Sequence, residues 1–86
     1  MKVLDLKDIE NILYEVFPVN KFPKKIEELK YDDFNEWDSL GNFNLLLAVE
    51  EFYNVRFTME EMTNIRSVKE LIHVLNSKIK KVGNDR

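Results

Sequence analysis

The sequence predicts an all-α protein, a small four-helix bundle with a long loop between the first two helices and a short third helix. Three observations lead to this fold class. Apolar residues recur at helical spacing in three separate stretches. Residues 58–61 and 67–70 spell capping boxes, which mark helix starts. The chain has only two glycines and two prolines, too few for the tight turns of a β-sandwich, and its 86 residues suffice for one domain.

The first helix is expected over residues 6–17, with Asp5 as its N-cap. Pro18 ends this helix, because proline disfavours the helical conformation in the residue before it. The inward face of the helix consists of Ile9, Ile12, Leu13, Val16 and Phe17. A polar segment then extends to Asp38, and residues 26–29, shortly after Pro23, favour a single helical turn.

The second helix is expected over residues 39–53, with Asn54 as a left-handed stop. It has two apolar faces. The face expected in the core consists of Leu45, Leu46, Val49, Phe52 and Tyr53. The opposite face, which we call the second stripe, consists of Leu40, Phe43 and Leu47. A surface helix needs only one apolar face, so the second stripe predicts a docking surface. The alternative is that Phe34 and Trp37 of the preceding loop fold back over it.

The third helix is expected to begin after Thr58 and to end near Asn64. The fourth begins at residues 67–68, and its inward residues are Val68, Leu71, Ile72, Leu75 and Ile79. Gly83 is expected to terminate it. The predicted domain therefore spans residues 1–82, and residues 83–86 are expected to form a flexible tail.

Ser39 is the residue to which the pattern assigns chemistry. The tripeptide Asp38-Ser39-Leu40 lies where the polar segment meets the second helix, so the Ser39 hydroxyl is close to unpaired backbone N–H groups. A phosphate ester at this position is stabilised by those groups and by the helix dipole. Gly41 is expected to leave open space beside Ser39.

The charge distribution restricts the kinds of partner. Residues 27–65 carry ten acidic groups against Lys30 and Arg56, a net charge of −8, which favours positively charged partners and disfavours nucleic acid. The absence of cysteine and the presence of one histidine disfavour a disulfide framework and a zinc site. No stretch has the pattern of a signal peptide or a membrane span, so we expect a cytoplasmic monomer that does not insert into membranes.

Residues 37–75, WDSLGNFNLLLAVEEFYNVRFTMEEMTNIRSVKELIHVL, resemble the acyl and peptidyl carrier proteins. The resemblance lies in the DSL motif, the apolar helix that ends in a glutamate pair and aromatics, the TMEE turn, Ile65 and the SVKEL opening. It implies an acyl-carrier four-helix bundle. It also implies that Ser39 is esterified by 4'-phosphopantetheine from coenzyme A, transferred by a Mg²⁺-dependent phosphopantetheinyl transferase. The arm ends in a thiol, which holds an acyl or aminoacyl group as a thioester.

The resemblance further implies roles for the neighbours of Ser39. Asp38 matches an aspartate that orients the serine hydroxyl and the metal during transfer. Leu40, Phe43 and Leu47 are expected to contact partner enzymes, and Glu50 and Glu51 to meet their basic residues. These partners are the transferase, an acyl- or aminoacyl-loading ligase and downstream transferases or synthases. The chain itself is then a carrier and not an enzyme, with no catalytic residue and no metal of its own.

One departure points to a subclass. Carriers of fatty acid synthesis usually have acidic residues just after DSL, whereas this chain has Gly41, Asn42 and Asn44. That difference favours a stand-alone carrier of a specialised pathway. Three alternatives stay open: an unmodified carrier-like interaction module, a helical nucleic-acid-binding regulator, and a small-molecule enzyme. The identity of the cargo is open as well.

Overall fold

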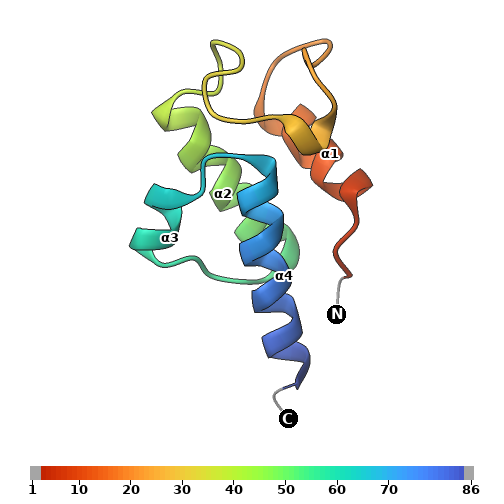
Figure 1. The fold of residues 1–86 in the computed structure, drawn as a ribbon, viewed down its shortest axis with the longest axis vertical. Helices are drawn as coiled ribbons and strands as arrows, with labels where there is room; N and C mark the ends of the chain where they lie inside the picture. Colours follow the sequence, from red (N-terminus) through yellow and green to blue (C-terminus); the bar gives the residue numbers. More distant parts are fainter. Residues whose placement is uncertain (1–2, 85–86) are drawn as a thin grey trace.

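The computed structural model describes the backbone of residues 3–84 and the side chains of residues 3–79. That part of the chain has four α-helices, one short 3₁₀ helix and no strand, which confirms the predicted all-α class. In chain order they are α1 (Leu6–Val16), η1 (Ile26–Glu28), α2 (Ser39–Tyr53), α3 (Met59–Asn64) and α4 (Val68–Asn84). Figure 1 shows α3 at one side of the bundle formed by the longer helices. None of the helices described combines the length and apolar character needed to cross a bilayer.

The start of α1 follows the prediction, and its end differs by one residue. The Asp5 side chain accepts a hydrogen bond from the Lys7 N–H at 3.0 Å and so caps the first turn. The helix ends at Val16, and Phe17 is the C-cap, with its N–H bonded to the Leu13 carbonyl at 2.9 Å. The single helical turn predicted after Pro23 is η1.

Helix α2 has the bounds that the sequence predicts. The Asp38 carboxylate accepts a hydrogen bond from the Gly41 N–H at 2.9 Å, which satisfies one of the free donors of the first turn. Asn54 adopts the left-handed conformation, with φ of 56°, and stops the helix.

The two capping boxes differ. At α3 the box is complete, because Thr58 Oγ1 accepts from the Glu61 N–H and Glu61 accepts from the Thr58 N–H. At α4 only half of the predicted box forms. Ser67 Oγ accepts from the Glu70 N–H, but the Glu70 carboxylate accepts from the Arg66 N–H, one residue further upstream.

The predicted end of α4 is wrong. The helix continues through Gly83 to Asn84, so Gly83 does not terminate it. A glycine has no side chain that prevents it from continuing a helix, and an i−4 hydrogen bond is available to it there. The expected flexible tail of residues 83–86 therefore begins with helical residues, and residues 85–86 lie outside the described part. The domain boundary after residue 82 stays a prediction.

The predicted inward faces meet in one core. Leu45, Leu46, Val49 and Tyr53 of α2 are buried as expected, whereas Phe52 is half-buried. α1 packs against α2, and η1 packs against both α4 and α1. The fully buried core side chains are Ile9, Leu13, Phe17, Leu29, Trp37, Leu45, Leu46, Val49, Val68, Leu71 and Leu75. Burial of each such side chain contributes roughly 1.5–3 kcal/mol to folding.

The long connection between α1 and α2 is held against the end of the bundle where α2 begins (Figure 1). Phe17, Phe22, Phe34 and Trp37 form a chain of aromatic contacts with ring centroids 5.1–6.0 Å apart. These rings pack toward α1 and not over the second stripe. The alternative in which Phe34 and Trp37 cover Leu40 and Phe43 is therefore wrong.

Backbone hydrogen bonds tie the same connection to the link between α3 and α4. The Tyr31 N–H donates to the Arg66 carbonyl at 2.7 Å, and the Val68 N–H donates to the Leu29 carbonyl at 2.9 Å. They flank an isolated antiparallel bridge between Lys30 and Ser67. Two loops that are far apart in the sequence thus meet beside the first turn of α2.

Candidate functional site

Ser39 is the first residue of α2 and its side chain is exposed. Since Asp38 caps the turn from the preceding position, the serine hydroxyl is not used for capping and is available for chemistry. The start of α2, the long connection and the α3–α4 link gather at one end of the molecule (Figure 1). The structure therefore presents Ser39 on a surface built from three separate segments.

Asn42 is buried beneath this surface and links its segments by hydrogen bonds. It is only 8% exposed, and its side-chain oxygen accepts a hydrogen bond from Trp37 Nε1 at 2.9 Å. Its side-chain nitrogen donates to the Ile65 carbonyl at 3.0 Å. One amide thus joins the connection, α2 and the α3–α4 link, and satisfies two polar groups that are cut off from water. The first turn of α2 is held in a defined position as a result.

Gly41 has a packing role that corrects the expectation of open space. A Cβ atom added there would meet the backbone carbonyl of Glu36 and lie 2.9 Å from Phe17 Cε1. The connection therefore passes directly over Gly41, and only glycine permits that approach. Gly41 and Asn42 are both buried, so packing accounts for their identities, and of the three neutral residues after DSL only Asn44 faces solvent.

Tyr31 contacts Ser39 directly. Its hydroxyl lies 3.2 Å from Ser39 Oγ, and either oxygen can donate the hydrogen bond. Both residues line a groove of about 190 Å³ between the start of α2 and α3. The other lining residues are Asn42, Phe43, Met59, Met62, Thr63 and Arg66. The groove thus combines polar groups, among them Ser39 and Arg66, with phenylalanine and methionine side chains.

The second stripe faces solvent. Leu40, Phe43 and Leu47 have exposed fractions of 68%, 44% and 41%, which confirms the exposure that the sequence predicts. Met59 of α3 is 77% exposed and extends the apolar surface, whereas Met62 packs partly against the core. An apolar patch of this kind next to a modifiable serine suits a docking surface.

The two glutamates assigned to partner binding differ in their surroundings. Glu50 is half-buried, and its carboxylate accepts a hydrogen bond from the Phe57 N–H at 2.7 Å. It therefore holds the loop between α2 and α3, a role that the sequence pattern does not reveal. Glu51 is exposed. Of the two, Glu51 is the carboxylate that is free to meet a basic partner residue.

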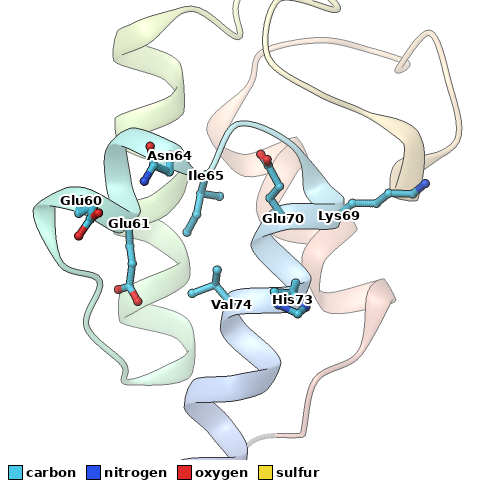
Figure 2. Close-up of a pocket in the computed structure, with 8 residues that line it drawn as sticks. All are labelled: Glu60, Glu61, Asn64, Ile65, Lys69, Glu70, His73 and Val74. Atoms are coloured by element: carbon cyan, nitrogen blue, oxygen red, sulfur yellow. The ribbon is translucent and has the colours of Figure 1, made fainter.

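A second, larger cavity of about 400 Å³ lies between α3 and α4. Figure 2 shows Ile65 and Val74 directed into the space between the helices, with Glu60 and Glu61 on one side and Lys69 and His73 on the other. Ser39 is not among the residues that line it. In the described part of the chain no group of His, Asp and Glu side chains is arranged to hold a metal ion.

Two carboxylates near the site have lowered pKa values. Burial alone would raise the pKa of Asp33, but a hydrogen bond from the Lys30 N–H and the ammonium groups of Lys24 and Lys30, at 3.1 and 3.6 Å, lower it. The pKa of Glu61 is lowered by the hydrogen bond from the Thr58 N–H and by the Lys78 ammonium at 2.9 Å. In their charged forms Asp33 stabilises the connection between α1 and α2, and Glu61 stabilises the start of α3.

Sequence reasoning missed three residues of this site: Tyr31, Arg66 and the structural role of Asn42. Tyr31 and Arg66 are eight and 27 positions from Ser39, so no local spacing rule relates them to it. The signal for Asn42 was available, because it lies on the core face of α2, three and four residues before Leu45 and Leu46, where a buried amide needs partners.

The chain is similar to the acyl carrier protein of Coprothermobacter proteolyticus, with 27% identity over 73 residues. The matched region covers 85% of this chain and 88% of that protein, so the similarity is not confined to the motif around Ser39. No protein-family model matches the chain, and no solved structure does.

Proposed function

We propose that this chain is an acyl carrier protein, a carrier and not an enzyme, and that Ser39 is its attachment site for 4'-phosphopantetheine. The observation that carries this proposal is the placement of Ser39. Its hydroxyl is exposed and does not cap the helix, and it lies at the first position of a long helix. The apolar stripe next to it is not covered by any part of the described chain.

The residues around Ser39 fit such an arm. The groove beside the hydroxyl is lined by polar groups, of which Tyr31 contacts Ser39 where the phosphate would be, and by apolar side chains. Phe43, Met59 and Met62 would contact the arm, and Ser39 would hold it covalently. When attached, the arm would supply the thiol on which an acyl or aminoacyl group is carried as a thioester.

Asp38 has two separable tasks in this proposal. As N-cap it fixes the first turn through one carboxylate oxygen, bonded to the Gly41 N–H. The second oxygen remains available to orient the Ser39 hydroxyl or the Mg²⁺ of the transferase. Since asparagine is also a good N-cap, Asp38→Asn would keep the helix and remove the charge.

The second stripe and Glu51 would form the docking surface. Leu40, Phe43 and Leu47 would contact the phosphopantetheinyl transferase first, then a loading ligase and the downstream transferases or synthases. Glu51 would pair with a basic residue of these enzymes, and Glu50 would contribute charge from its fixed position. Such interfaces combine a modest apolar contact with electrostatic attraction, which gives the fast exchange that a monomeric carrier needs.

We also propose that the chain serves a specialised pathway and not fatty acid synthesis. Packing explains the identities of Gly41 and Asn42. The argument from neutral residues after DSL therefore depends on Asn44 alone. The cargo would be selected by the loading enzyme and not by this groove.

The test is intact-protein mass spectrometry after incubation with coenzyme A, Mg²⁺ and a broad-specificity phosphopantetheinyl transferase. We expect the wild-type chain to gain the mass of one phosphopantetheine and Ser39→Ala to gain none. Ser67→Ala is the matched control, because Ser67 also lies at a helix start but is half-buried. It should be modified like the wild type. No gain in a folded wild type, with a known carrier labelled in parallel, would instead support an unmodified interaction module.

A further inference from the structure

Tyr31, which contacts Ser39, is paired with Arg66. The Arg66 guanidinium lies over the Tyr31 ring, 4.9 Å from its centroid, and the Tyr31 hydroxyl is 3.2 Å from Ser39 Oγ. All three side chains line the same groove. Tyr31 and Arg66 come from the two loops that meet beside α2, where the Tyr31 N–H bonds to the Arg66 carbonyl.

The pair is fixed in position. Arg66 Nε donates to the Thr63 carbonyl at 3.2 Å, and stacking on the tyrosine ring orients the guanidinium plane. The remaining guanidinium N–H groups have no acceptor among residues 3–79, and no carboxylate in that range forms an ion pair with Arg66. By contrast, Lys24 and Lys30 both pair with Asp33. Arg66 is thus an oriented cation with unpaired donors in the groove that Ser39 also lines.

Modification of Ser39 would give the pair a function. Once Ser39 Oγ is esterified it has no proton, so in the contact with Tyr31 only the tyrosine can donate. A phosphodiester also brings a negative charge into a segment that already has a net charge of −8 over residues 27–65. Arginine is the side chain best suited to offset that charge, because its planar array of donors matches phosphate oxygens.

We propose that Tyr31 and Arg66 form a binding site for the phosphodiester of modified Ser39. The tyrosine hydroxyl donates to the ester or to a phosphate oxygen, and the guanidinium binds the phosphate oxygens. Both act as positioning residues that set where the arm leaves the protein surface. This inference rests on the proposed modification of Ser39.

The test uses the modified protein and the ³¹P resonance of its phosphodiester. Wild type, Tyr31→Phe, Arg66→Gln and Arg66→Lys are modified, checked by mass and compared in native buffer and in urea. In the native wild type we expect a ³¹P shift distinct from that of the unfolded chain. In Tyr31→Phe and Arg66→Gln it should move toward the unfolded value, and Arg66→Lys should keep part of the difference.

A matched control and a second readout separate this site from a structural effect. Arg56→Gln makes the same charge change in the loop beyond α2, a helix of 15 residues and so about 22 Å long. It should leave the ³¹P shift unchanged. In ¹⁵N spectra, modification should shift the Nε–H signal of Arg66 and not that of Arg56.

The outcomes are distinguishable. A wild-type chain that gains no phosphopantetheine overturns both this inference and the proposed function. A chain that is modified, but whose ³¹P shift matches the unfolded value or responds equally to Arg56→Gln and Arg66→Gln, overturns the phosphate site alone. If Arg66→Gln fails to fold, Tyr31→Phe and the Arg66 Nε–H signal of the wild type decide the question.

Discussion

At the start of α2, neighbouring residues divide between packing and presentation. Gly41 and Asn42 are buried and fix the turn, whereas Ser39, Leu40 and Asn44 face solvent. The division follows the helical period, because residues two apart in a helix point to opposite sides. The face of the helix on which each residue lies therefore decides whether it packs or faces solvent.

Asn42 should be the most sensitive polar residue of the site. Asn42→Leu has nearly the same volume but leaves the Trp37 indole N–H and the Ile65 carbonyl buried without partners. Each of these two unsatisfied groups costs about 1–3 kcal/mol, so we expect a loss of about 2–6 kcal/mol in the free energy of unfolding. Urea denaturation followed by Trp37 fluorescence measures it.

Asn44→Leu is the control for this prediction, since Asn44 is on the same helix and exposed. Its effect should stay within about 0.5 kcal/mol. Equal stabilities of Asn42→Leu and Asn44→Leu would show that the buried amide does not hold the three segments together.

Among the elements, α3 depends most on its end contacts. Six residues are too few for a helix that is stable by itself. The complete capping box and the ion pair between Glu61 and Lys78 of α4 hold it in place, and both use the Glu61 carboxylate. One side of the groove at Ser39 therefore depends on a single ionised group.

Acidification should loosen α3 through Glu61. Because the folded-state pKa of Glu61 is lowered, its contribution to stability is fully present above the unfolded pKa of about 4.3 and is lost as the pH falls through the folded pKa. Glu61→Gln does not titrate, so its free energy of unfolding should fall by about 1 kcal/mol less between pH 7 and pH 3. Urea unfolding across that range measures the difference.

Asp33 and Glu60 also have to be considered in this experiment. Asp33 has a lowered pKa as well, so acid sensitivity will persist in Glu61→Gln. Glu60→Gln, on the same helix with an exposed side chain, is the control and should keep the full pH dependence. If Glu61→Gln and the wild type lose stability equally, the capping carboxylate does not support α3.

At the level of the whole molecule, charge and apolar surface coincide. The second stripe lies within the acidic segment of residues 27–65. A basic partner surface would be attracted from a distance and would then contact the exposed leucines, so recognition combines steering with a small apolar contact.

Leu47→Gln should weaken docking and leave folding intact. Since Leu47 is 41% exposed, we expect the KM for the carrier in the transferase reaction to rise about fivefold, or about 1 kcal/mol, with kcat unchanged. Leu6→Gln is the control, because Leu6 of α1 is 40% exposed and lies outside the stripe. Equal KM values for the two variants would place the docking surface elsewhere.

Much of the fold was predictable, because its signals are local. The bounds of α2 follow from Asp38, Asn54 and the apolar period, and the start of α3 follows from a capping box within four residues. The end of α4 was not predictable from Gly83, since glycine permits a stop without imposing one. The position of Ser39 at the start of α2 and the exposure of the second stripe were predictable for the same local reason.

What the amino-acid order determines alone is the set of helices, the exposed stripe and the position of Ser39 at the start of α2. These depend on caps and periodicity within one turn or a few. Three features form only once the chain is folded: the hydrogen bonds of the Asn42 side chain, the close approach at Gly41 and the Tyr31–Arg66 pair. They join loops separated by tens of residues, and no local rule specifies which loops will meet once the core has packed.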